Sequence, residues 1–183
     1  SRVEPSLQAA FIEFGSEKKA FLPFDEIHPS YFKIPHNEKI LKNGNQKNNE
    51  IDDEKENKKH FLSFYRKYKI QDVIKKDQVL LIQIVKEERG TKGAAVTTFI
   101  SLPGRYSVLL PNNSSTGGVS KKISNPLDRK RLKRLHDNFN LPDGMSLIIR
   151  TNAISAEDED IIADFSYLRK LWTKIREDTL KSK

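Results

Sequence analysis

Residues 83–113 read QIVKEERGTKGAAVTTFISLPGRYSVLLPNN, and the rest of the chain is organised around this stretch. Apolar and β-branched residues predict three strands here, the first of them buried, at 79–85, 94–102 and 106–110. The charged loop between the first two strands contains Gly90 and Gly93, which suit a hairpin tip with positive φ at a glycine. This tip would present Lys92 to solvent. An ordinary surface hairpin and a functional loop both fit the pattern.

Composition narrows the class of protein. The 183 residues are 36% hydrophobic, which is enough for a packed core, and they carry a net charge of +8. This basic balance indicates an acidic partner, with nucleic acid as the first candidate and an anionic membrane surface as the second. The absence of cysteine excludes a disulfide framework and a thiolate metal site. No apolar run approaches the ~18 residues of a membrane span, and the abrupt start without Met leads us to expect a piece of a larger protein.

The N-terminal region predicts two short strands, 7–14 and 20–24, separated by a charged turn. An aromatic strand, a charged turn and the string FLP are typical of five-stranded OB barrels that bind RNA. In such a barrel Phe11 and Phe21 would lie side by side on one face. Exposed rings on that face stack nucleobases, at roughly 1–3 kcal/mol per base. The alternative is that both rings belong to the core.

A change of composition follows. Residues at about 36–66 are rich in Asn, Lys and Glu and include a run with almost no apolar side chain, which predicts a flexible insertion. Order resumes within FLSFYRKYK at 61–69, where aromatic and basic residues alternate. These residues could contact RNA or pack back against the fold, and the pattern leaves both open. A short helical turn is expected at 69–78.

The fold is expected to change after SLPG at 101–104. Asn125 is a predicted helix N-cap with Pro126 at the first helical position, and the helix should end near residue 138. Leu132 and Leu135 lie on its apolar edge. The basic run 129–134 is either a solvated helix face or a phosphate-facing surface.

A strand at 145–151 should end by presenting Arg150 and Thr151, and a long helix at 157–180 should follow. Ser155 and Asp158 have the spacing of a capping box, and the acidic run at the helix start suits the positive helix terminus, so we assign no metal site there. One apolar stripe with steps of four and three residues indicates a core or interface face, formed by Ile161, Phe165, Leu168, Trp172 and Ile175.

Longer strings resemble the ribonuclease E/G family of bacterial endoribonucleases. The matching segments are collinear and cover nearly the whole chain outside the insertion: RVEPSLQAAFIEFG (2–15), FLPFDEI (21–27), KEERGTKGAAVTTFISLPGRYSVLLPNN (86–113), GGVSKKI (117–123), LPDGMSLIIRT (141–151) and DFSYLRKLW (164–172). The strings YKIQDVIKK (68–76) and GRYSVLLPNN (104–113) resemble the alphaproteobacterial branch of the family, which also carries a polar insertion at this place.

The resemblance implies an α+β fold in two domains. Residues 1–102 would form a ribosomal-S1-type OB-fold β-barrel that lacks its first strand. Residues 103–183 would form most of a small α/β domain that senses the RNA 5′ end and carries the long C-terminal helix. In the family, a separate catalytic domain holds the acidic residues that bind Mg and a cysteine-based Zn link. We therefore expect no cofactor in this fragment and assign no catalytic or metal residue here.

The resemblance also implies site residues. The residues that grip single-stranded RNA would be Phe11, Phe21 and Lys92, and those that hold the 5′-phosphate and terminal nucleotide would be Gly104, Val108, Lys121, Arg150 and Thr151. Two departures from the family pattern are Lys121, where many relatives have Arg, and Asn152-Ala153, which replaces Ala-Gly. A guanidinium fork with a hydroxyl and a backbone N–H is a fitting cage for a terminal phosphate.

The first hypothesis for function is thus the RNA-binding, 5′-monophosphate-sensing portion of a single-strand-specific endoribonuclease of RNA processing and mRNA decay. The fragment itself is expected to bind RNA without cutting it. The expected partners are single-stranded RNA with a 5′-monophosphate and, for the full-length enzyme, further copies of itself and degradosome-type proteins. The expected location is the cytoplasm, with peripheral attachment to the inner membrane as a variant. The alternatives are a freestanding non-catalytic OB-fold RNA-binding protein and a scaffold whose basic helix at 126–138 docks an acidic protein or lipid surface.

Overall fold

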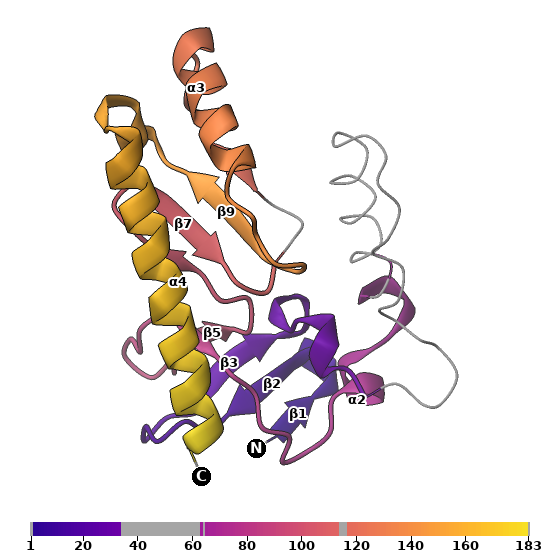
Figure 1. The fold of residues 1–183 in the computed structure, drawn as a ribbon. Helices are drawn as coiled ribbons and strands as arrows, with labels where there is room; N and C mark the ends of the chain where they lie inside the picture. The colour runs from indigo at the N-terminus through magenta and orange to yellow at the C-terminus, as the bar shows by residue number, and fades with distance from the viewer. Residues whose placement is uncertain (1, 34–62, 64, 114–116, 183) are drawn as a thin grey trace. The chain divides into compact units, whose positions relative to one another are not determined.

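The computed structural model describes residues 2–33, 63, 65–113 and 117–182. The chain divides into two compact units, Ser1–Phe99 and Ile100–Lys183, each with its own sheet and helices (Figure 1). The predicted α+β class is confirmed. The predicted insertion lies outside the described residues from 36 to 62, so its flexibility stays a prediction.

The first unit contains a five-stranded sheet in the order β1-β2-β3-β5-β4, built from β1 (Arg2–Glu4), β2 (Ala9–Ile12), β3 (Ala20–Pro23), β4 (Gln83–Lys86) and β5 (Ala95–Thr97). β2 and β3 form an antiparallel hairpin, β3 pairs in parallel with β5, and β5 pairs with β4 across the predicted hairpin. Among the described residues the sheet is open, because the three-residue β1 pairs with β2 alone. The described residues thus form no closed barrel, and the predicted OB-fold β-barrel lacking its first strand stays a prediction.

The core of the first unit lies between this sheet and a set of short helical turns. The turns are η2 (Phe24–Glu26), η3 (Pro29–Tyr31) and α2 (Ile70–Val73), whereas η1 (Pro5–Leu7), between β1 and β2, buries no residue. Leu22, Ile27 and Ile70 are fully buried there. Tyr65, in the aromatic–basic segment that sequence left open, packs edge-on against Phe24 and donates its hydroxyl to the Ile27 carbonyl at 2.7 Å. Its ring therefore closes the core.

The strand predicted as buried at 79–85 is wrong in both extent and burial. β4 begins only at Gln83, Val79 is 91% exposed, and Ile84 and Val85 are also exposed. β4 is an edge strand with one described neighbour, so its apolar side chains have less to pack against. The sequence contains the β-branched run, but composition does not distinguish an edge strand from a central strand of a sheet.

The second unit contains a four-stranded sheet in the order β6-β7-β9-β8, built from β6 (Leu102–Pro103), β7 (Ser107–Leu110), β8 (Gly118–Val119) and β9 (Ser146–Ile149). The strand expected at 94–102 is thus two strands, β5 and β6, which belong to different sheets. β8 pairs in parallel with β9 for only two residues.

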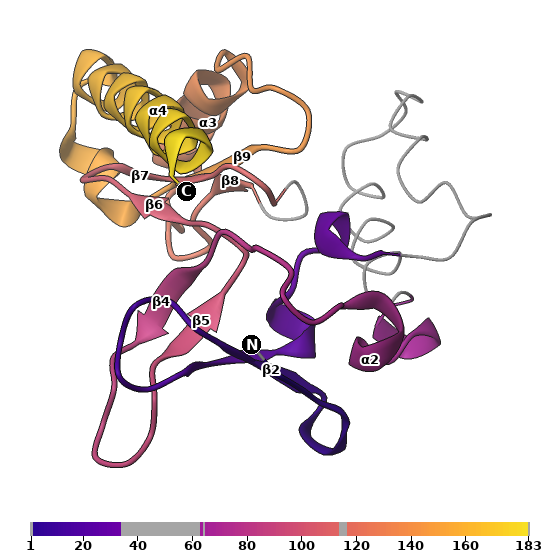
Figure 2. The same ribbon diagram turned by 90° about the horizontal axis from the view of Figure 1, so that it is seen from below.

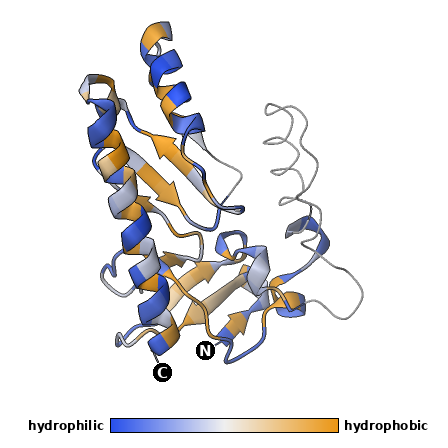
Figure 3. Cartoon of the chain, viewed as in Figure 1, coloured by the Kyte–Doolittle hydropathy of each residue, from blue (hydrophilic) through white to orange (hydrophobic). Residues whose placement is uncertain are grey.

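Two helices cover one face of the second sheet, as the view along α4 shows (Figure 2). They are α3 (Pro126–Asp137) and α4 (Asp158–Lys181), and the 3-10 helix η4 (Thr151–Ser155) links β9 to α4. Their apolar sides meet in a core that includes Leu132, Ile149 and Ile161, all fully buried or nearly so. The apolar colour accordingly follows the strands, whereas both helices alternate in colour (Figure 3).

The helix starts test the capping predictions. The Asn125 side chain accepts from the Leu127 N–H at 2.9 Å and Pro126 occupies the first turn, so the predicted start of α3 is confirmed. The predicted capping box of the long helix is wrong, because Ser155 ends η4 and Glu157 is the N-cap without a side-chain cap. The apolar stripe is confirmed at its N-terminal end, where Ile161, Phe165 and Leu168 are buried, while Trp172 and Ile175 are only half-buried.

Candidate functional site

An aromatic pair lies on the first sheet. The antiparallel register places Phe11 directly opposite Phe21, and their ring centroids are 5.8 Å apart in an edge-on arrangement. The Arg2 guanidinium lies 5.8 Å from the Phe11 ring centroid, a cation–π contact. Both rings are half-buried, so each keeps accessible surface. The predicted neighbourhood of the two rings is confirmed.

Lys92 lies at the hairpin tip, exposed, as sequence predicted. Its N–H donates to the Arg89 carbonyl at 3.0 Å and its carbonyl accepts from Arg89, which closes the tip around Gly90 with φ +57°. The tip is tied to the turn between β2 and β3, where Lys18 Nζ donates to the Gly90 carbonyl at 2.7 Å. A Cβ on Gly93 would lie 2.0 Å from the Lys19 carbonyl oxygen, so only glycine allows this close approach. The position of Lys92 is therefore fixed by backbone contacts on both sides.

A second cluster forms where β9 ends. β7 runs antiparallel to β9 and β8 runs parallel to it, so the start of β7 and the end of β8 reach the same sheet edge as Arg150. Arg150 Nη1 donates to the Gly104 carbonyl at 2.8 Å, and the Arg150 N–H donates to the Tyr106 carbonyl at 2.8 Å. The Ser120 N–H, next to Lys121, donates to the Ile149 carbonyl at 2.9 Å. The structure thus brings Gly104, Lys121 and Arg150 to one edge.

One carboxylate organises the Gly104 side of this edge. Asp164 on α4 accepts hydrogen bonds from the N–H groups of Arg105 at 2.9 Å, Tyr106 at 3.1 Å and Ser107 at 2.9 Å, and from the Ser107 hydroxyl at 2.7 Å. A Cβ on Gly104 would lie 2.5 Å from both Asp164 oxygens. Asp164 therefore fixes the turn 104–107 and, through it, the carbonyl that holds the Arg150 guanidinium.

Thr151 and Val108 complete the predicted set. Thr151 is exposed and opens η4 directly after Arg150. Val108 is half-buried and pairs with Ile148 on β9, two residues before Arg150. Because Ser107 reaches Asp164 on the helix-covered face, Val108 points to the opposite face of the sheet. Arg150 lies two residues after Ile148, the partner of Val108, so its side chain extends to that same face; Arg150, Thr151 and Lys121 are all exposed.

Two arginines of the basic run at 129–134 bind main-chain carbonyls. Arg129 Nη1 donates to the carbonyls of Ser120 at 3.1 Å and Ile123 at 3.3 Å. Arg131 donates to the carbonyls of Ala153, Ile154 and Ala156 and pairs with Asp158 at 2.6 Å. These two arginines fasten α3 to the loops on either side of the Arg150 edge, a structural role that sequence reasoning missed.

Sequence reasoning also missed Asp164. The available signal was its position three residues after Ile161, on the side of α4 that carries the apolar stripe. A carboxylate there is half-buried and needs donors. The donors lie in a turn nearly sixty residues earlier, so the pairing could not be read from local sequence.

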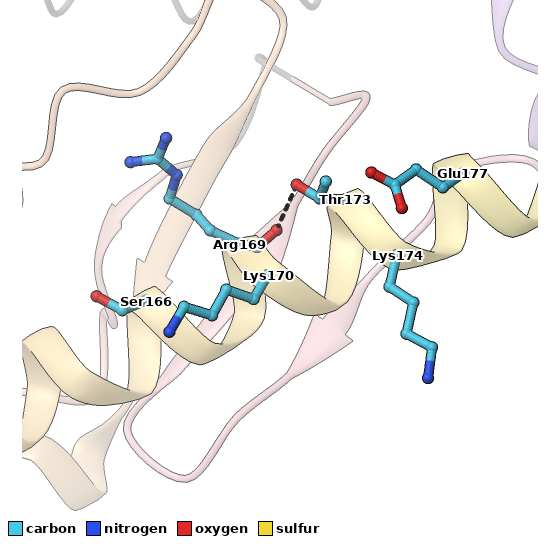
Figure 4. A pocket seen from close by; sticks show the side chains of 6 residues that line it. All are labelled: Ser166, Arg169, Lys170, Thr173, Lys174 and Glu177. Carbon is cyan, nitrogen blue, oxygen red and sulfur yellow. Dashed lines mark hydrogen bonds between the residues drawn. The ribbon is translucent and has the colours of Figure 1, made fainter.

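Two shallow hollows lie elsewhere. One, of about 490 Å³, runs along the exposed side of α4 and is lined by Ser166, Arg169, Lys170, Thr173, Lys174 and Glu177 (Figure 4). The other, of about 720 Å³ in the first unit, has a mixed lining that includes an ion pair of Lys19 with Glu13 at 2.8 Å. The hydrogen bond from Lys19 lowers the pKa of Glu13. Neither hollow contains a predicted site residue.

Within the described ranges, no group of three or more His, Cys, Asp or Glu residues could hold a metal ion. In the same part of the chain no helix is long and apolar enough to cross a membrane. Burial raises the pKa of the Tyr65 phenol well above its usual value, with Asp25 and Glu26 adding to the effect, and this fits a tyrosine that serves as a structural donor.

The half-exposed ring pair of the first unit is a surface suited to stacked bases, and the cation-lined edge of the second unit is, separately, suited to a phosphate. Comparison with known proteins makes this specific. Residues 101–183 match the sequence model of the ribonuclease E/G family. The whole chain is 40% identical over 176 residues to ribonuclease E of Escherichia coli (strain K12), covering 96% of this chain and 14% of that protein.

Two further ribonucleases are similar to the chain along nearly its whole length. Ribonuclease E of Buchnera aphidicola subsp. Schizaphis graminum (strain Sg) is 38% identical over 181 residues, or 99% of this chain and 16% of the relative. Ribonuclease G of Salmonella typhimurium (strain SL1344) is 36% identical over 177 residues, or 97% of this chain and 31% of the relative. The chain is similar to ribonucleases E and G along nearly its whole length, as its sequence strings indicated, and it spans a third or less of the length of these relatives.

Proposed function

We propose that this chain is the RNA-binding and 5′-monophosphate-sensing portion of a single-strand-specific endoribonuclease that acts in RNA processing and mRNA decay. The family similarity supports a ribonuclease rather than a freestanding RNA-binding protein, because the relatives named above are ribonucleases. The observation that carries the sensing role is the exposure of Arg150, Thr151 and Lys121 on chain segments that end at the same edge of the second sheet.

The edge suits a terminal phosphate for electrostatic reasons. A guanidinium has five N–H donors in a planar fork, and Arg150 uses one nitrogen on the Gly104 carbonyl at 2.8 Å. This contact orients the fork and leaves further donors directed to solvent. A 5′-monophosphate carries more charge than an internal phosphate and accepts several hydrogen bonds, which Arg150, the Thr151 hydroxyl and Lys121 would supply. A 5′-hydroxyl end offers neither the charge nor the acceptors.

The first unit would be an S1-type OB domain that grips the strand. The mixed, open sheet in the order β1-β2-β3-β5-β4 with its β3–β5 parallel pair supports this assignment, since OB folds are partly open barrels. Phe11 and Phe21 would stack two bases, and Lys92 would contact a phosphate beside them. Stacking is tolerant of base identity, which fits an enzyme that acts on many RNAs.

The remaining features belong to the proposed full-length enzyme. Its catalytic domain would hold Mg, and a Zn link would join further copies of the chain into a homo-oligomer. Degradosome-type proteins would be additional partners, and the enzyme would act in the cytoplasm. In this chain the proposed role is to bind RNA and read its 5′ end, with no cleavage of its own.

The test is fluorescence anisotropy with two RNAs of one sequence, one with a 5′-monophosphate and one with a 5′-hydroxyl. At one fixed salt concentration, the wild type should prefer the monophosphate by about tenfold, as expected for one charge-assisted contact set. Arg150→Ala should abolish the preference, and Arg150→Lys should restore only part of it because the fork is lost. The matched control is Arg176→Ala on the exposed side of α4. Equal affinity of the wild type for both ends would remove the sensing role.

A further inference from the structure

Helix α3 carries a positive charge that the proposed 5′ pocket does not use. Its twelve residues contain five Lys or Arg against two Asp, whereas the 24 residues of α4 contain five against six acids. Two of the five, Arg129 and Arg131, are bound to main-chain carbonyls. The others are exposed on the side of the helix away from the buried Leu132 and Leu135.

Lys130 and Arg134 define this surface, which we call the α3 ridge. They are four residues apart, so they lie one above the other on the same helix face. The structure records no ion pair between either of them and any described residue, and Asp137 pairs instead with His136 at 3.4 Å. Like charges at this spacing destabilise a helix by roughly 0.2–0.5 kcal/mol. The ridge is thus a self-repelling arrangement that a bound polyanion would relieve.

The ridge has a fixed position relative to the Arg150 edge. Arg129 holds the carbonyls of Ser120 and Ile123, on either side of Lys121. Arg131 holds the carbonyls of Ala153 and Ile154, just after Thr151. Because α3 is fastened to both loops of this edge, the fold fixes the distance between the ridge and the Arg150 edge. Ile149 packs against α3, so Arg150 extends from the opposite face of the sheet, and only an RNA longer than a few nucleotides would contact both.

We propose that the α3 ridge is a second contact for RNA, which binds the sugar-phosphate backbone beyond the 5′-terminal nucleotide. This inference rests on the proposed RNA-binding function. We assign the ridge to backbone phosphates, because α3 contains no Phe, Tyr or Trp on which a base could stack. His136 is turned inward, with Nε2 3.1 Å from the Leu147 carbonyl oxygen. Binding at the ridge is therefore independent of sequence and strongly dependent on salt.

The test uses the double variant Lys130→Gln/Arg134→Gln and two 5′-monophosphate RNAs, one of about five and one of about 25 nucleotides, since short sites span only ~4–16 nucleotides. The short RNA should bind the variant as it binds the wild type. The long RNA should bind about tenfold more weakly near 0.1 M salt, and its log–log salt slope should fall by about 1.4, or ~0.7 per lost phosphate contact. The matched control is Arg176→Gln/Lys181→Gln, which removes the same charge from exposed positions of α4.

The outcomes separate this inference from the proposed function. Unchanged binding of the long RNA to the ridge variant, with the Arg150-dependent preference intact, would overturn the ridge alone. An equal loss of long-RNA affinity in the control variant would show that the effect depends only on net charge, and this result would also overturn the ridge proposal. Loss of binding to anionic phospholipid vesicles, with RNA binding unaffected, would assign the ridge to a membrane surface. Circular dichroism of the variant should show unchanged helix content, because both side chains are exposed and Gln is a good helix former.

Discussion

The two units place their candidate binding groups by different means. In the first unit, Phe11 and Phe21 are ten residues apart and are brought together by one hairpin register. In the second, Gly104, Lys121 and Arg150 come from three chain segments, and their meeting depends on a parallel pair, an antiparallel pair and Asp164 from a helix further on. The aromatic pair is thus a local feature, whereas the arginine edge is a tertiary one. A single remote substitution should therefore damage the second far more than the first.

The largest effect is expected for Asp164→Ala. This change leaves three N–H groups and one hydroxyl of turn 104–107 without their acceptor, and we expect it to destabilise the second unit by about 3 kcal/mol. The chain's one tryptophan, Trp172, lies in this unit, so urea unfolding followed by its fluorescence measures the loss. Glu177→Ala, an exposed acid on the same helix, is the control. A loss no greater than that of the control would show that water replaces Asp164.

Two glycine substitutions should each impair RNA binding by a different unit. Gly93→Ala brings a Cβ against the Lys19 backbone, and Gly104→Ala brings one against the Asp164 carboxylate, each at a cost of about 1–3 kcal/mol. Gly93→Ala should weaken binding of RNA with either 5′ end, and Gly104→Ala should lower the monophosphate preference. Anisotropy with both RNAs measures the two effects, and each variant is the control for the other. Identical profiles for the two variants would contradict the division of roles.

A smaller effect is expected for Phe11→Leu. Leucine keeps most of the buried apolar contact on β2 but removes the ring face, so RNA affinity should fall by about 1 kcal/mol, or roughly fivefold. The loss should be equal for 5′-monophosphate and 5′-hydroxyl RNA, measured by anisotropy. Ile12→Leu, the adjacent residue of the same strand, is the control. A loss of affinity confined to the 5′-monophosphate RNA would contradict the proposed base-stacking role of Phe11.

The smallest effect is a pH dependence of the first unit. Burial lowers the pKa of His28 below its ordinary 6.5, so the folded state favours the neutral ring, whose Nδ1 accepts from the Ser30 N–H. The unfolded state binds more protons as pH falls below 6.5, so stability is lost on acidification and is fully present above that pH. His28→Asn keeps an N-cap acceptor for η3 and removes the titration.

Pulsed hydrogen exchange in urea, read on peptides from β2 and β3, measures this loss at neutral and mildly acidic pH. The wild type should unfold at lower urea in acid, and His28→Asn should shift less. An equal acid shift in both proteins would assign the pH dependence to other groups of the unit.

Much of the local structure could be predicted. The hairpin strands at Ala9–Ile12 and Ala20–Pro23, the tip around Gly90 and the cap at Asn125 follow from side-chain chemistry within a few residues. The failures share one cause. Each failed prediction depends on neighbours that are distant in sequence. Such neighbours decide whether Val79 is buried, whether 94–102 is one strand or two, and whether Ser155 caps a helix or ends η4.

The candidate site divides in the same way. Sequence alone determined the candidate site residues, because a ring, a guanidinium or a hydroxyl is a property of the residue itself, and the strings around Phe11 and Arg150 were long enough to indicate the family. Only the tertiary structure decided which of them lie close to one another. It showed Arg129 and Arg131 bound to carbonyls, left Lys130 and Arg134 exposed, and placed Asp164 under turn 104–107. The physical reason is that hydrogen bonds and charge pairs depend on distances of a few ångströms, which distant segments attain only when a common core fixes their positions.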